Sequence, residues 1–187
     1  MSADVQSLLE RDHDSLGELL VELDAELAKP NFTRAFELLD LFWARLAVHI
    51  RAEHLHLFPA VAKLPRSSND EKDLPTAAQV DEAIELLRSD HNFFMTELAD
   101  LMKSAREICR GRAAAPDELL NFRARLSTIQ SRLKTHNWLE EDEVYKWPGR
   151  FLDDETLAEL NQRLRRELEN LPARLASGEA QRAKGAG

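Results

Sequence analysis

Long runs in which apolar residues recur every three or four positions constrain this chain more than any other feature. That spacing matches the helical period of 3.6 residues and not the strict alternation of a half-buried strand. The runs stop close to prolines and glycines, which break helices. They cover roughly residues 5–27, 31–59, 80–108, 119–148 and 153–171. The pattern predicts an all-α protein.

The lengths and order of the runs predict the architecture. Four helices of about 25 residues joined by short connections favour an up-down-up-down four-helix bundle. The excess of Leu over Val and Ile, with only 6 Gly, agrees with helices. We expect a bundle over residues 1–150 and an extra C-terminal helix over residues 151–172. We expect a disordered tail over residues 173–187, because small and charged residues there offer little to pack.

Charge and cysteine content exclude several function classes. The chain has 25 Lys and Arg against 34 Asp and Glu, a formal net charge of −9. This argues against a nucleic acid or an anionic membrane as the main partner. The single cysteine, Cys109, excludes an internal disulfide and a thiolate-only metal site. The sequence contains no bilayer-length apolar run and no secretory start, so we expect a cytoplasmic protein. Its oligomeric state stays open.

Each of the four long runs carries one histidine among its apolar residues. His13, for example, lies four residues after Leu9 and three before Leu16, so the three share a helix face. The four stripe histidines are His13, His49, His91 and His136. Glu53 and Glu140 each follow such a histidine by four residues and continue its stripe. A buried carboxylate is costly unless it is paired, protonated or bound to a metal.

The same residues form an internal repeat. DHDSLGELLVEL around His13 and DHNFFMTELADL around His91 share one pattern, and ARLAVHIRAEHLHLF and SRLKTHNWLEEDEVY share another. The chain is therefore two helix pairs, each supplying one histidine and then a His-x-x-x-Glu unit. We expect a site with twofold pseudo-symmetry on the bundle axis.

A metal centre explains this pattern better than polar packing does. A lone histidine on an apolar face is usually a satisfied core residue, but four with two matched glutamates rarely arise independently. A metal-free helical interaction module is the competing interpretation. It predicts that His-to-Leu changes on the stripes stabilise the fold. Glu10-x-x-His13 and Glu53-x-x-His56 also match the Glu-x-x-His unit of ferritin-like sites, but the second half of the chain lacks it.

The donor count predicts two metal ions. Four imidazoles and two carboxylates exceed one tetrahedral zinc site. They suit two ions that each bind two histidines and share two bridging glutamates. An added oxo or hydroxo bridge still leaves one position per ion open. Mixed imidazole and carboxylate donors with open positions suit iron or manganese, and zinc can replace them.

The arrangement H…HxxxE…H…HxxxE resembles the hemerythrin-like, or HHE cation-binding, family over about residues 5–148. The resemblance implies a four-helix bundle with two non-haem iron ions that binds or reacts with O2, H2O2 or NO. The alternative it implies is a non-catalytic iron or oxygen sensor, or a metal store, acting through a partner. Oxygen carriers of the family have a fifth histidine. Leu87 and Met95, four residues either side of His91, do not supply it.

Other polar residues near the stripes are candidates for supporting roles. His56 lies one turn beyond Glu53, and Tyr145, the only tyrosine, matches Phe58 in the repeat. Either residue could join the site or simply pack near it. Asp12 and Asp90 precede their histidines and are either hydrogen-bond acceptors across helices or surface residues. We expect His54 in solvent and Glu141 at the surface.

Overall fold

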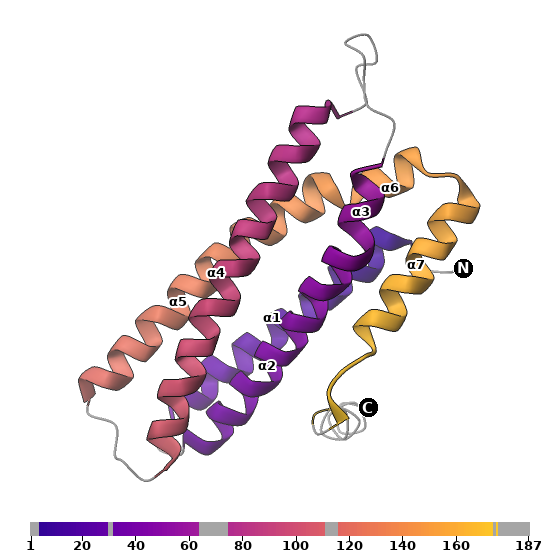
Figure 1. Cartoon of the computed structure of the whole chain (residues 1–187). Coiled ribbons are helices and arrows are strands. Elements are labelled where there is room, and N and C mark those ends of the chain that lie inside the picture. The colour runs from indigo at the N-terminus through magenta and orange to yellow at the C-terminus, as the bar shows by residue number, and fades with distance from the viewer. Residues whose placement is uncertain (1–3, 30–31, 64–74, 111–115, 174, 176–187) are drawn as a thin grey trace.

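Four long helices form the body of the molecule in a computed structural model (Figure 1). The structure describes residues 4–29, 32–63, 75–110, 116–173 and 175. The long helices are α1 (Val5–Leu27), α2 (Phe32–Ala52), α4 (Ala77–Cys109) and α5 (Pro116–Leu139). They lie side by side in alternating directions, and every regular element in the described ranges is helical. The predicted all-α bundle is confirmed.

Local side-chain chemistry starts two of these helices. At α1, the Asp4 carboxylate accepts a hydrogen bond from Ser7 N at 2.7 Å. At α4, Thr76 and Gln79 form a reciprocal capping box. Both devices satisfy backbone N–H groups that have no partner inside the helix.

The buried stripes meet in two apolar clusters. One cluster joins α1, α2, α4 and α5 and includes Leu23, Phe42 and Phe94. The other includes Leu9, Phe58 and Tyr145 and lies at the end of the bundle where α6 (Lys146–Phe151) packs. The four stripe histidines lie between these clusters, so apolar packing closes their layer from both ends.

A π-helical turn interrupts the helical path in each half of the chain. The turns are η1 (Glu53–Leu57), followed by α3 (Phe58–Val61), and η2 (Glu140–Val144), followed by α6. Each π turn begins at one of the two glutamates predicted as metal ligands. Helical structure then continues beyond Pro59 and Pro148, where the sequence predicted that the helices end. Each proline falls in the first turn of the resumed helix, where a missing N–H costs little. Such turns are often found at functional sites.

A further helix, α7 (Asp154–Leu168), packs outside the bundle against α2, α1 and η1. Its inner face buries Leu160 and Leu164, and Asp153 caps its first turn. This confirms the predicted C-terminal helix. Most of the predicted tail, residues 174 and 176–187, lies outside the described residues. Among the described residues, no helix is long and apolar enough to cross a membrane.

Candidate metal centre

The structure brings all six predicted ligand residues together at the centre of the bundle. Each of the four histidines is at most 6% exposed, and the two glutamates are 0% exposed. Nε2 of His13 lies 3.1 Å from Nε2 of His49, and Nε2 of His91 lies 3.1 Å from that of His136. The histidines therefore form two pairs, one from α1 and α2 and one from α4 and α5.

Both glutamates span the two histidine pairs. Glu140 Oε2 lies 3.3 Å from His13 Nε2, and Glu140 Oε1 lies 3.1 Å from His136 Nε2. Glu53 Oε1 lies 3.5 Å from His49 Nε2, and Glu53 Oε2 lies 3.3 Å from His91 Nε2. Each carboxylate thus presents one oxygen to each pair, as a bridging ligand requires. His13, His49 and Glu140 form one group able to hold a metal ion, and His91, His136 and Glu140 form another.

Two buried carboxylate oxygens accept no hydrogen bond. These atoms, Glu53 Oε2 and Glu140 Oε1, lie within 3.3 Å and 3.1 Å of histidine nitrogens but are not aligned with them. A buried polar atom without a partner normally costs free energy. Ligand atoms that lie this close together without satisfying one another fit a shared metal ion.

Asp12 and Asp90 each form a hydrogen bond with a histidine on the neighbouring helix, one histidine from each pair. Asp12 Oδ2 lies 2.9 Å from His49 Nδ1, and Asp90 Oδ2 lies 3.2 Å from His136 Nδ1. A carboxylate can only accept, so Nδ1 carries the proton and Nε2 faces the cluster. This decides between the two predicted roles, because both aspartates are acceptors across helices.

Two arginines anchor these aspartates. Arg45 donates to Asp12 at 2.6 Å, and Arg132 donates to Asp90 at 2.7 Å. Sequence reasoning missed this role, although each arginine precedes its helix's histidine by four residues in the repeat. This shared spacing of four residues could have indicated that both arginines support the site.

The other two histidines have different outer partners. Glu141 Oε1 lies 2.7 Å from His13 Nδ1, whereas His54 Nε2 lies 2.9 Å from His91 Nδ1. The expectation of a solvated His54 was therefore wrong, because its side chain reaches across to another helix. Glu141 does lie at the surface, with its side chain 39% exposed, and still reaches His13. Burial, and then the charge of His91, lowers the pKa of His54 below its usual value.

Tyr145 lies inside the cluster. Its hydroxyl donates to Glu53 Oε1 at 2.6 Å and to Glu140 Oε2 at 3.1 Å. Burial raises the pKa of Tyr145 well above its usual value, and the charges of Glu140 and Glu53 add to this. His56 instead faces α7, where its Nε2 lies 3.9 Å from Glu167 Oε2.

The buried charges support one another. Burial alone would lower the pKa of His49, but the charge of Glu53 and the Asp12 hydrogen bond raise it well above its usual value. Burial would raise the pKa of Glu53, yet His49 and His91 hold it well below its usual range. In this ionised state the cluster is ready to exchange protons for metal ions.

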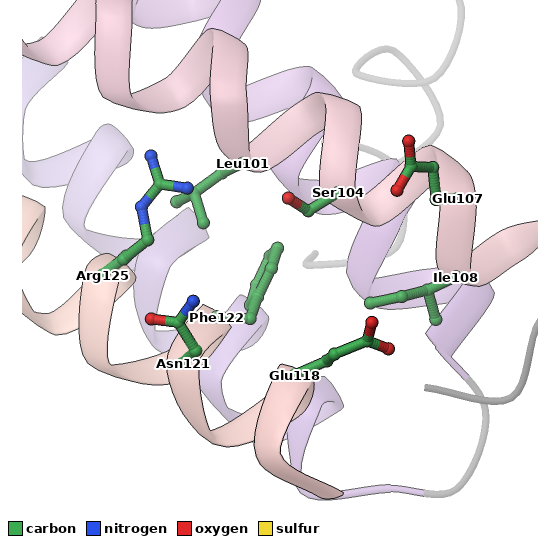
Figure 2. Close-up of a pocket in the computed structure, with 8 residues that line it drawn as sticks. All are labelled: Leu101, Ser104, Glu107, Ile108, Glu118, Asn121, Phe122 and Arg125. Atoms are coloured by element: carbon green, nitrogen blue, oxygen red, sulfur yellow. The ribbon is translucent and has the colours of Figure 1, made fainter. Parts of the chain in front are cut away.

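A separate pocket between α4 and α5 offers no comparable ligand set. Its lining combines Glu107 and Glu118 with Arg125 around Phe122 and contains no histidine (Figure 2). Leu101, also in its lining, is ten residues past His91. At 1.5 Å per residue this is about 15 Å along the helix. The pocket is therefore distinct from the histidine cluster.

Comparison with known families agrees with this geometry. The family model of the hemerythrin HHE cation-binding domain matches residues 4–147. The chain belongs to this family. The match covers the four long helices and both π turns of this HHE domain, while α7 lies beyond it. Neither the search of curated proteins nor the search of solved structures found a match. The domain is a metal-binding helical bundle with buried His and Glu ligand groups.

Proposed function

We propose that this HHE domain holds two non-haem iron ions and binds or reacts with O2, H2O2 or NO. The terminal ligands are His13, His49, His91 and His136, and the bridging ligands are Glu53 and Glu140. One observation carries the proposal: each buried carboxylate presents one oxygen to each histidine pair. A single ion would not need this duplicated arrangement.

The residues present fit a pair of divalent or trivalent ions. Two carboxylate oxygens without a hydrogen-bond partner and four inward Nε2 atoms converge at the centre of the cluster. Mixed nitrogen and oxygen donors suit iron or manganese, and zinc binds the same donors. The bound iron ions would supply the one-electron chemistry that these side chains lack.

The protein's own contribution is orientation and exclusion of water. Asp12, Asp90 and Glu141 hold Nδ1 of three histidines, which directs each Nε2 inward. Phe58 and Phe94 pack their rings against His91 and His136. These apolar rings therefore help to exclude water from the centre.

Metal analysis and spectroscopy test the proposal. After anaerobic iron loading we expect about two irons per chain. His49→Ala should lower that number, and the exposed Asp14→Ala should not. Spectral changes on adding O2, H2O2 or NO to the loaded protein would identify the physiological ligand class. Fewer than about two irons, or full loading of His49→Ala, would contradict the proposal.

The same experiment separates the alternative function. A metal store or iron or oxygen sensor would gain protease resistance on loading, because a bound ligand stabilises the folded state. It would show no turnover of H2O2 or NO. Loading with zinc or manganese in parallel tests whether the effect is specific for iron.

A further inference from the structure

The two halves of the centre are not equivalent. The repeat pairs Glu53 with Glu140, but it pairs His54 with Glu141 and Phe58 with Tyr145. Both unmatched positions lie against the cluster. The half containing His13 and His49 has a phenol and an outer carboxylate, and the other half has a phenyl ring and an outer imidazole.

The π turn places Tyr145 at the cluster. In a regular α-helix a residue five positions after Glu140 would lie about 140° around the axis from it. In η2 the Tyr145 N–H bonds to Glu140 O at 2.8 Å, an i to i+5 bond that sets Tyr145 one turn above Glu140. The η1 turn closes in the same way, from Phe58 N to Glu53 O.

The Tyr145 hydroxyl has the spacing of a metal donor. Metal bonds of about 2.0–2.2 Å at right angles place neighbouring donors about 3 Å apart. Tyr145 Oη lies 3.1 Å from His13 Nε2, 3.3 Å from His49 Nε2 and 3.1 Å from Glu140 Oε2. A hydroxyl that served only as a hydrogen-bond donor would need a single acceptor. The Tyr145 hydroxyl instead lies close to four candidate ligands, which are His13, His49, Glu53 and Glu140.

The opposite half lacks this donor. Phe58 stacks on His91 with a centroid distance of 5.9 Å and an interplanar angle of 12° and offers no oxygen. The half containing His91 and His136 therefore presents two imidazole nitrogens and two carboxylate oxygens, one donor fewer than its counterpart.

We propose that Tyr145 Oη is a donor to the ion held by His13 and His49, so that a small ligand binds at the ion held by His91 and His136. This rests on the two-iron function proposed above. With one bridging ligand between the ions, Tyr145 completes six donors on the first ion and leaves five on the second. On coordination, the phenol O–H bond gives way to an O–metal bond, and the proton leaves to solvent.

A surface groove lies beside the open half. This groove, of about 780 Å³, runs between α4 and α5, and Asp90 and His136 contribute to its lining. Leu86 and Trp138, at 49% and 61% exposed, line the same groove. A small molecule in this groove lies on the His136 side of the centre.

Spectroscopy of the diferric protein tests the Tyr145 bond. Because the chain has one tyrosine, any phenolate-to-iron charge-transfer band, and any tyrosine ring modes it enhances in resonance Raman spectra, must arise from Tyr145. We expect this band in the native chain and its loss in Tyr145→Phe when the absorbance is compared per bound iron. The double variant Phe58→Tyr, Tyr145→Phe moves the phenol to the other half and should restore a band.

Two results would overturn the inference without touching the proposed function. A native protein with two irons and no such band would leave Tyr145 as a hydrogen-bond donor to Glu53. Azide, an anionic probe of open positions, should bind once per native centre and twice per Tyr145→Phe centre. An unchanged azide number in that variant would contradict the open-position assignment. Failure to bind two irons at all would instead refute the proposed function.

Discussion

At the scale of single residues, the centre depends on side chains that never face it. Each Nδ1 of the four histidines has a partner from another helix. Three partners are carboxylates, which fix the tautomer and raise the basicity of the ring. The fourth partner, His54, is an imidazole, and this difference adds to the asymmetry that Tyr145 creates.

Asp12→Asn should weaken metal binding by about 10–100-fold, because His49 loses its anionic partner. Iron or zinc affinity, measured by competition with a chelator, checks this. Asp14→Asn is the matched control, since Asp14 is exposed on the same helix. Equal affinities for the two variants would show that Asp12 does not orient His49.

At the scale of elements, side-chain caps stabilise the starts of α1, α4 and α7, and π turns change which side chains the helices present. The Asp4 carboxylate stabilises the start of α1, and its hydrogen bond from Ser7 N lowers the pKa of Asp4 below its usual value of 3.8. The π turns change the register after each glutamate. The face that follows them therefore differs from the one that a regular helix would present.

Asp4→Ala should lower the free energy of unfolding by about 1 kcal/mol near neutral pH. Because the pKa of Asp4 is lowered on folding, its contribution is present above pH 3.8 and is lost as the pH falls through the folded-state pKa. Urea denaturation from pH 7 to pH 3 measures this. Asp4→Asn keeps the cap without the charge, so the difference between Asn and Ala should not shrink at low pH. If the difference in unfolding free energy between the native protein and Asp4→Ala did not change with pH, the charge of Asp4 would not contribute to the cap.

Leu164→Ala should cost about 2–5 kcal/mol of stability, because Leu164 is 0% exposed between α7 and the bundle. The 69% exposed Leu120 in α5 supplies the control, and Leu120→Ala should change stability by less than about 0.5 kcal/mol. Chemical denaturation compares them. Similar losses in both variants would mean that α7 does not contribute through its buried face.

At the scale of the whole molecule, two apolar clusters enclose one polar layer. The layer contains two carboxylates with 0% exposure, so the fold carries charges that a hydrophobic core would omit. Replacing a whole set of buried, paired charges with well-packed apolar residues is often neutral or stabilising for the fold itself. We therefore expect that this layer binds metal and makes the metal-free protein less stable than an apolar core would.

Metal loading should raise the stability of the whole domain, by about 2.7 kcal/mol per bound ion when free metal is 100 times the dissociation constant. Glu53→Gln should remove most of that increase, because one of the two bridging carboxylates is lost. Thermal unfolding with and without a chelator measures both effects. Glu143→Gln, an exposed change within η2, should retain the full increase. A full increase in Glu53→Gln would rule out its bridging role.

Most of the fold and the six residues that meet at the centre could be predicted from the sequence. The reason is that helical periodicity is local: positions three and four residues apart share a face whatever the rest of the chain does. His13, His49, His91 and His136 each fell on an apolar stripe, and Glu53 and Glu140 followed at one helical turn. The internal repeat then indicated that the two halves face each other.

The outer partners and the position of Tyr145 could not be predicted in the same way. Glu141 meets His13, and His54 meets His91, across helices that only packing brings together. Tyr145 would point away from Glu140 in a regular helix, and the i to i+5 bond of η2 turns it inward. A period of 3.6 residues predicts the ligands, but the change of register in a π turn depends on the packed helices around it.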